Sequence, residues 1–328
     1  MRGHLSFSIL LFLFFASLRL CVMFLSFRSC PSVNLLLMNQ LADTSFVLEA
    51  RAKQHHWRGA GLLSIKSFVG GSALYTIDGG TFLVDDERFL IFNHAQEYEI
   101  TIDSDTPVES FCVFFDSRLA ADAVRNQTTT PDRLLDDPFD GSAAPPLFFE
   151  RTYPHDALLS PALVHFRAAF RQRQGEIGWL DEQFHGLMLR LLSVHQRTLA
   201  EVNHAPGSRP ATREELYRRL HIARDYIAAS YPQPIRLQEV AAVACLSPNH
   251  LLRSFKALFG QSPYQYLIDE RMRQARWLLA HTDHPITDIC FAVGYASLGS
   301  FSWLFTQRCG LSPQAFRLLN RAASSIPS

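Results

Sequence analysis

The sequence predicts a two-domain α+β protein. Its N-terminal part is expected to be an antiparallel β-barrel with a helical hairpin, and its C-terminal part an all-α domain with two helix-turn-helix units joined by a linking helix. One observation behind this prediction is a pattern that occurs twice between residues 237 and 317, and another is a series of short β-type runs between residues 45 and 116. With 328 residues, of which 48% are apolar, the chain is long and apolar enough for two cores.

Residues 5–27 are almost entirely apolar. Residues 5–27 are long enough to span a bilayer, but Arg19 interrupts the run and no small-residue cleavage site follows it. Met38 begins the stretch MNQLADTSFVLEAR, which looks like the N-terminus of an ordinary cytoplasmic protein. We interpret residues 1–37 as a start-site artefact; a membrane anchor or an early buried segment is the alternative.

Residues 38–157 are expected to form the barrel. The β-type runs cover residues 62–69, 72–78, 80–84, 88–93, 98–102 and 108–115, and glycine-rich and aspartate-rich turn signals separate them. Many short strands at this spacing favour an antiparallel barrel or sandwich. Residues 117–157 read as a loop with one short helix at 119–125, because turn-forming residues dominate the rest.

A small barrel can hold one ligand in its interior. The candidate effector-binding residues are His55, His56, Trp57, Tyr75, Phe82, Phe92, His94 and Tyr98. Core packing is the alternative for each of them, and the adjacent His55 and His56 must point to opposite faces of a strand. His94, Glu97 and Glu99 do not form the histidine and glutamate spacing of a metal-dependent barrel enzyme. The sequence therefore predicts no catalytic residue, no metal and no cofactor.

Residues 158–202 read as two antiparallel helices with apolar stripes at helical spacing. Such a hairpin can pack on the barrel or pair two copies of the chain as a dimer, and both readings stay open. Residues 203–212 read as a flexible linker, residues 213–320 as the helical domain and residues 321–328 as a tail.

The duplicated pattern organises the helical domain. Ser247, Leu251, Phe255, Gly260, Ser262 and Pro263 recur 50 positions later as Ser297, Phe301, Phe305, Gly310, Ser312 and Pro313. Each copy predicts a helix, a tight turn and a second helix that begins at a serine cap and ends at a glycine. In a helix-turn-helix unit, this second helix can enter a major groove of DNA.

Residues 263–281 join the two copies and predict a helix of 19 residues, which spans roughly 28 Å. One turn of B-DNA is about 34 Å. A rod of that length would set the two reading helices in successive major grooves on one side of the duplex.

The duplicated region resembles the DNA-binding domain of the AraC/XylS transcription regulators. The resemblance rests on residues 235–317, which read IRLQEVAAVACLSPNHLLRSFKALFGQSPYQYLIDERMRQARWLLAHTDHPITDICFAVGYASLGSFSWLFTQRCGLSPQAFR. Residues 72–102, which read SALYTIDGGTFLVDDERFLIFNHAQEYEITI, more loosely resemble the cupin-like sensor domain of such proteins. The resemblance implies a transcription regulator, an activator or a repressor, that binds double-stranded operator DNA. Its expected partners are a small-molecule effector in the barrel, RNA polymerase and a second copy of the chain.

Charge and cysteine usage agree with these expectations. Residues 212–328 carry 13 Arg and Lys against 8 Asp and Glu, so this part is basic by +5, while the rest of the neutral chain carries −5. The six cysteines show no metal-binding spacing and indicate free thiols in a reducing cytoplasm. The alternative function is a cupin-type metal-dependent enzyme with a helical regulatory tail.

The second helix of each unit supplies the residues expected to contact DNA. In the first copy they are Ser247, Asn249, His250, Leu252, Arg253 and Lys256, and in the second Ser297, Gly299, Ser300, Trp303, Gln307 and Arg308. By resemblance, Asn249 and Arg253 occupy the usual base-contacting positions, and these side chains suit adenine and guanine respectively. A plain solvated face is the alternative.

The second copy departs from the family pattern. Family members commonly have an arginine where Trp303 stands and a polar residue where Gly299 stands, and neither Trp nor Gly can fork onto a guanine. The second helix is therefore expected to read DNA more weakly, through backbone contacts and DNA shape. On the linking helix, Arg271, Arg273 and Arg276 are candidates for phosphate contacts or ion pairs.

Overall fold

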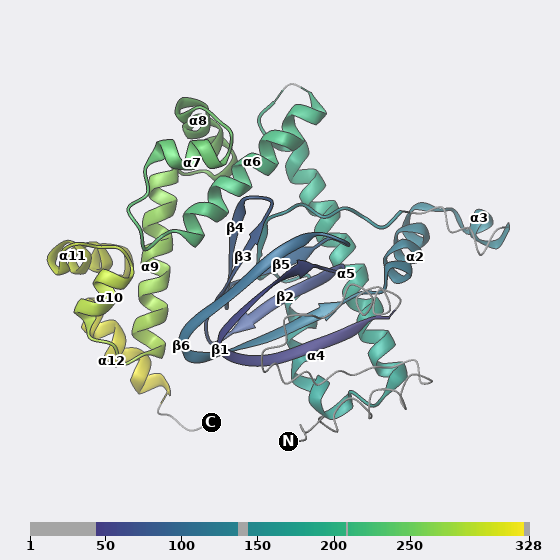
Figure 1. The fold of residues 1–328 in the computed structure, drawn as a ribbon, viewed down its shortest axis with the longest axis horizontal. Coiled ribbons are helices and arrows are strands. Elements are labelled where there is room, and N and C mark those ends of the chain that lie inside the picture. The colour runs from purple at the N-terminus through teal and green to yellow at the C-terminus, as the bar shows by residue number, and fades with distance from the viewer. Residues whose placement is uncertain (1–43, 137–143, 208, 325–328) are drawn as a thin grey trace, which may run out of the picture. The chain divides into compact units, whose positions relative to one another are not determined.

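A computed structural model describes residues 44–136, 144–207 and 209–324 (Figure 1). The predicted N-terminal segment, residues 1–37, lies outside this part of the chain. The chain divides into two compact units, one containing residues 1–78 and 83–201 and the other residues 79–82 and 202–328. Within the described ranges, no helix has both the length and the apolar character needed to cross a bilayer.

An antiparallel sheet forms most of the first unit. Its strands are β1 (Phe46–Ala60), β2 (Ser64–Val69), β3 (Ala73–Ile77), β4 (Gly80–Val84), β5 (Arg88–Phe92), β6 (Glu97–Phe114) and β7 (Thr152–Pro154). The strand order is β4-β3-β6-β2-β5-β7, and β1 pairs with β6 outside this path. The long β6 pairs with β1, β2 and β3, so the sheet curls into a nearly closed barrel, as predicted (Figure 1).

Strand β6 is longer than the sequence pattern suggested. The aspartates at residues 103 and 105 predict a turn, but β6 is one strand of 18 residues. The irregularity falls in its pairing with β1 instead: Ala52 faces Val108 and Gln54 faces Asp103, so several residues of β6 lie opposite one residue of β1. A bulge thus accommodates the turn-forming residues without ending the strand.

Residues 117–157 were expected to be mostly loop, and this prediction is wrong in part. They contain α2 (Ser117–Thr128), α3 (Pro131–Asp136) and β7, which pairs with β5. Helix α2 starts where it does because the Asp116 carboxylate accepts a hydrogen bond from the backbone N–H of Arg118 at 2.8 Å. Its buried residues Ala120 and Ala123 join the core.

The predicted helical hairpin is present as α4 (Ser160–Arg173) and α5 (Ile177–His204). Its apolar stripes pack on the barrel, which is one of the two readings left open by the sequence. The shared core contains Leu163, Phe166, Phe170, Leu180, Phe184 and Leu187 from the helices and Ile65, Ile91, Phe111 and Val113 from the sheet. One face of β2, β5 and β6 is thus covered by helices, and the alternate residues of these strands face the barrel interior.

The second unit is helical. It contains α6 (Pro210–Ala229), α7 (Leu237–Val243), α8 (Pro248–Phe259), α9 (Pro263–His281), α10 (Ile286–Ala292), α11 (Leu298–Cys309) and α12 (Pro313–Ser324). Helix α9 has the bounds that the sequence predicts for the linking helix. It contributes Leu267 to a core with α6, α7 and α8, and Met272, Ala275 and Leu279 to a second core with α10 and α11. Figure 1 shows α9 running between the two helix pairs.

The duplicated residues start and stop the helices as predicted. The Ser247 hydroxyl accepts a hydrogen bond from the N–H of His250 at 3.4 Å, and Ser297 does the same for Ser300 at 3.5 Å. Helices α8 and α11 both end at a glycine in the left-handed region, with φ of 73° at Gly260 and 75° at Gly310.

The two tight turns differ in chemistry. Gly294 has a φ of 84°, and a Cβ placed there would lie 2.6 Å from the carbonyl oxygen of Pro232, so this turn requires glycine. At the equivalent position of the first copy, Cys245 adopts a φ of 51°. Cys245 is exposed, whereas Cys290 is buried.

Candidate nucleic-acid interface

Helix α8 presents one polar face. Leu251 and Phe255 are fully buried, and the residues that point away from them are Asn249, Leu252, Arg253 and Lys256, all exposed. Among the described residues, the side chains of Asn249, Arg253 and Lys256 form no hydrogen bond or ion pair with the rest of the chain. Three side chains with hydrogen-bond donors are therefore available to an external partner on a single face.

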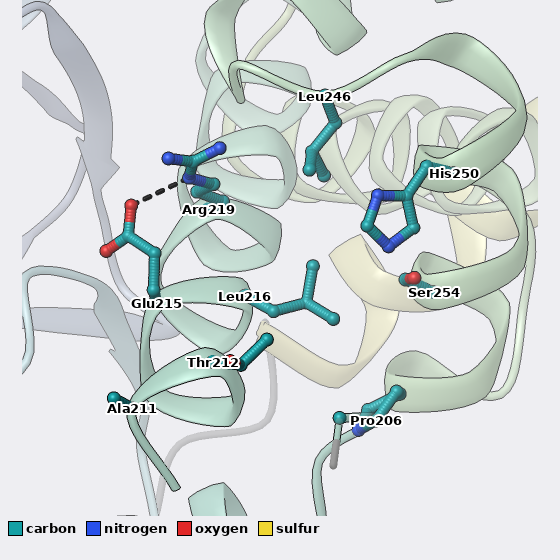
Figure 2. A pocket seen from close by; sticks show the side chains of 10 residues that line it. Pro206, Ala211, Thr212, Glu215, Leu216, Arg219, Leu246, His250 and Ser254 are labelled. Atoms are coloured by element: carbon teal, nitrogen blue, oxygen red, sulfur yellow. Dashed lines mark hydrogen bonds and ion pairs between the residues drawn. The ribbon is translucent and has the colours of Figure 1, made fainter. Parts of the chain in front are cut away.

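Two other polar residues of α8 lie elsewhere. Ser254 is only 6% exposed. His250 lines a pocket of about 620 Å³ between α6 and α8 together with Leu216, Leu246 and Ser254. Figure 2 shows the His250 ring turned toward this pocket. We therefore place His250 at the margin of the interface rather than in its centre.

The same pocket contains a contact that supports the first helix-turn-helix unit. Arg219 of α6 pairs with Glu215 at 2.7 Å, as Figure 2 shows, and it also donates to the backbone oxygen of Cys245 at 2.9 Å. This second bond fastens the tight turn between α7 and α8 to α6, so the direction of α8 is set by the body of the domain.

Helix α11 presents a different face. The offset of 50 residues maps Asn249, Arg253 and Lys256 onto Gly299, Trp303 and Thr306. All three are exposed, as are Ser300 and Gln307, and the Trp303 residue is 66% exposed. Thr306 is a candidate that reading the sequence missed, although the offset itself points to it. Its hydroxyl donates to the backbone oxygen of Ser302 at 2.7 Å, so it offers less to a partner than Lys256 does.

Arg308 does not lie on this face. The offset maps it onto Leu258, which is partly buried, and its guanidinium pairs with the carboxylate of Asp269 on α9 at 2.5 Å. The Arg308 side chain is 42% exposed in this pair, and its contact with DNA stays a prediction. Arg308 is the sole basic residue of α11, so the exposed face of this helix has no cationic side chain.

The arginines of α9 also make contacts within the chain. Arg271 donates to the backbone oxygens of Tyr231 at 2.9 Å and Gln233 at 3.0 Å. Arg273 pairs with Glu270, which is itself buried. Of the two roles expected for these arginines, the structure supports the intramolecular one, and Arg271 holds α9 against the segment between α6 and α7.

Part of the predicted effector set gathers in the barrel interior. Tyr75, Phe92 and Tyr98 are buried, and their ring centroids are 4.3–5.6 Å apart. The ring centroid of Trp57 lies 4.9 Å from that of Tyr98. The register places Trp57 opposite Ile100 and His55 opposite Ile102, so both belong to the inner face of β1. Phe82 of β4 is buried as well.

Two predicted effector residues lie outside this cluster. His56 is exposed on the opposite face of β1 from His55, as the alternation requires, and pairs with Glu99 at 3.6 Å. His94 is exposed in the turn between β5 and β6. The roles of His56 and His94 in effector binding stay predictions, and neither side chain joins the aromatic cluster. In the described ranges, no group of three or more His, Cys, Asp or Glu side chains is arranged to hold a metal ion.

Comparison with known proteins identifies the family. A helix-turn-helix domain model matches residues 240–318. The HTH-type transcriptional activator RhaR of Klebsiella pneumoniae is 30% identical over 203 residues, which are 61% of this chain and 71% of that protein. This chain belongs to the AraC/XylS family. It is a DNA-binding transcription regulator.

Other AraC/XylS relatives match the C-terminal part of this regulator. The HTH-type transcriptional activator RhaS of Klebsiella pneumoniae is 36% identical over 99 residues, which are 30% of this chain and 36% of that protein. The chain therefore spans about a third of RhaS. The solved C-terminal domain of AraT, a response regulator from Geobacillus stearothermophilus, is 34% identical with a TM-score of 0.30, covering 31% of this chain and 84% of that one.

Proposed function

We propose that this AraC/XylS-family regulator binds an operator of two unequal halves, with α8 supplying most of the base selectivity. The observation that supports this proposal is the contrast between two equivalent positions. Arg253 of α8 is exposed and forms no hydrogen bond or ion pair with the described residues, whereas Trp303 of α11 stands where the second copy would carry an arginine. Arginine forks onto guanine in the major groove, and each such pair discriminates against the wrong base.

Helix α9 sets the distance between the two reading helices. Its 19 residues span about 28 Å, and both cores of the domain include residues from it. The bonds from Arg271 to the Tyr231 and Gln233 carbonyls fix it against the first half. A spacer held in this way suits half-sites in successive major grooves.

Trp303 gives α11 a different kind of contact. A tryptophan that is 66% exposed leaves a large apolar surface in water, and the hydroxyls of Ser300 and Thr306 flank it. On DNA, the indole packs against a thymine methyl group or a sugar, and the hydroxyls reach phosphates. This half of the operator is therefore read mainly by shape and backbone contact.

The barrel is the sensor in this proposal. A small effector bound among the interior aromatic residues shifts the protein between states that bind DNA differently, which requires unequal affinity for those states. RhaR and RhaS are named as transcriptional activators, which favours activation, with RNA polymerase as a partner, for this chain too. The protein then acts in the cytoplasm. Val164, Leu189 and Leu199 are exposed apolar residues of α4 and α5 and mark the surface for homodimer formation.

Arginine-to-alanine variants of α8 and α11 test the DNA-binding proposal. Arg253→Ala is expected to weaken specific binding by about 1–3 kcal/mol and to relax selectivity at one base pair, because a guanine contact is lost. Arg308→Ala removes the same charge from the other helix, but its guanidinium is paired with Asp269, so selectivity is expected to stay unchanged. Quantitative footprinting on matched and mismatched sites measures both. Equal losses of selectivity in the two variants would overturn the assignment.

A further inference from the structure

A lysine lies in the barrel interior. Lys66 is the third residue of β2, and the residues on either side of it point the opposite way: Ile65 belongs to the core under α4 and α5. The register places Lys66 opposite Leu90 of β5 and Cys112 of β6, so these three side chains share the inner face. Lys66 is 2% exposed, although lysine is rarely buried without a partner.

The amino group of Lys66 is surrounded by aromatic rings. Its nitrogen lies 3.8 Å from the ring centre of Phe114, 5.5 Å from that of Tyr98 and 5.6 Å from that of Phe92. Within the described part of the chain, it forms no hydrogen bond and no ion pair. The faces of these rings attract a cation, but they do not replace the water or the counter-ion that a buried charge requires.

Among the described residues, no group that faces Lys66 supplies a negative charge near neutral pH. Burial raises the pKa of the Cys112 thiol, and burial also raises the pKa of the Tyr75 and Tyr98 phenols. All three side chains are therefore neutral, and neither phenol forms a hydrogen bond among the described residues. Burial lowers the pKa of Lys66 to about 8, so at pH 7 most of this amine still carries its charge. Within the described ranges, the barrel interior thus holds a cation and two phenol donors without an acceptor for them.

We propose that Lys66 binds the carboxylate of a small monoanionic effector whose apolar body lies among the barrel aromatics. The proposal rests on the sensor role given to the barrel above and adds the chemical class of its ligand. A single cation matches a single negative charge, and the neutral phenols of Tyr75 and Tyr98 are further donors for the same carboxylate. The walls formed by Phe92, Tyr98 and Phe114 exclude a highly hydrated dianion such as phosphate.

Paired acids and amides test this proposal on the full chain. Phenylacetate and hexanoate carry a carboxylate, whereas phenylacetamide and hexanamide have nearly the same shape without the charge. At pH 7, at least one acid at millimolar concentration is expected to raise the melting temperature of the protein. The matching amide is expected to leave the melting temperature unchanged. In Lys66→Met, which keeps the length of the side chain, the affinity for that acid is expected to fall by roughly 10- to 100-fold, because a charged hydrogen bond is lost.

The variant also separates a ligand-binding lysine from a structural one. Without ligand, Lys66→Met is expected to melt at the same or a higher temperature than the wild type, because a buried unpaired charge is gone. A lower melting temperature of the variant would show that the lysine is structural. The proposal would be overturned if the wild type responded to neither acid, or if acid and amide stabilised it equally.

Footprinting with the same two proteins separates this inference from the proposed function. Both the wild type and Lys66→Met are expected to protect the same operator without ligand, because Lys66 lies in the other unit from α8 and α11. Loss of protection in both would refute the proposed DNA-binding role. Protection without any response to carboxylates would refute the inference about Lys66 alone.

Discussion

Phe255→Ala is expected to lower the free energy of unfolding by about 3–5 kcal/mol, the usual cost of removing a buried phenylalanine ring. Phe255 is fully buried in the core of the first helix-turn-helix unit. Its ring centre lies 4.5 Å from that of Phe259 and 6.0 Å from that of Tyr266. Loss of this ring leaves a cavity under α8, and α6 and α9 cannot fill this cavity without moving. DNA binding by α8 is therefore expected to weaken as well.

The duplication supplies a matched variant for this experiment. Phe305 stands 50 positions later, is also fully buried, and packs against Phe301 and Phe316 in the second core. Denaturant unfolding measures the total loss for Phe255→Ala and Phe305→Ala, and amide hydrogen exchange locates it. We expect lost protection in α7 and α8 for the first variant and in α10 and α11 for the second. The same loss across both halves in both variants would mean that the two cores unfold as one.

The second large effect is a pH dependence of stability that Lys66 causes. The pKa of Lys66 falls from 10.5 to about 8 on burial. Between these values the unfolded chain binds more protons at this site than the folded chain, so stability rises with pH. Below pH 8 both states are protonated and the cost of the buried charge is fully present. The gain is complete near pH 10.5 and reaches at most about 3 kcal/mol, since each pKa unit corresponds to about 1.4 kcal/mol.

Urea unfolding of the wild type and Lys66→Met over this pH range measures the effect. Cys112, Tyr75 and Tyr98 also contribute to the pH dependence, because burial raises their pKa values in the folded chain while the unfolded chain titrates them near their ordinary values. They are common to both proteins, so the difference between the two free energies of unfolding isolates Lys66. That difference should shift in favour of the wild type as the pH rises. A difference independent of pH would show that Lys66 is not buried as a charged group.

The helical domain could be predicted from the sequence because its signals are local and occur twice. Serine caps, glycine stops and apolar residues at helical spacing act within a few residues, and the second copy checks the first. The bounds of α9 are therefore those expected from the sequence. The barrel is stabilised by strand pairing between residues far apart in the sequence, and such pairing produces a weaker local sequence pattern. The half-exposed strand β1 has no separate signal, and aspartates that usually mark a turn lie in a bulge of β6.

The candidate site shows the same division. Asn249, Arg253 and Lys256 could be placed because the helical period alone separates them from Leu251 and Phe255. The ion pair of Arg308 could not be predicted, because its partner Asp269 is on another helix, which the sequence of α11 does not reveal. His56 and His94 were chosen by residue type, but strand alternation and a turn direct them outward. Lys66 was missed because a lysine in a short strand normally indicates an exposed face.

Selection of binding sites from a random DNA pool by the full chain tests the unequal operator most directly. We expect two half-sites about 10 base pairs apart, one with strong base preferences and one with weak preferences. Repeating the selection with Arg253→Ala should erase a preference in the strong half, whereas Trp303→Ala should alter only the weak half. Two half-sites of equal strength, or a loss in the weaker half on replacing Arg253, would contradict the central claim that α8 reads the bases and α11 mainly the shape.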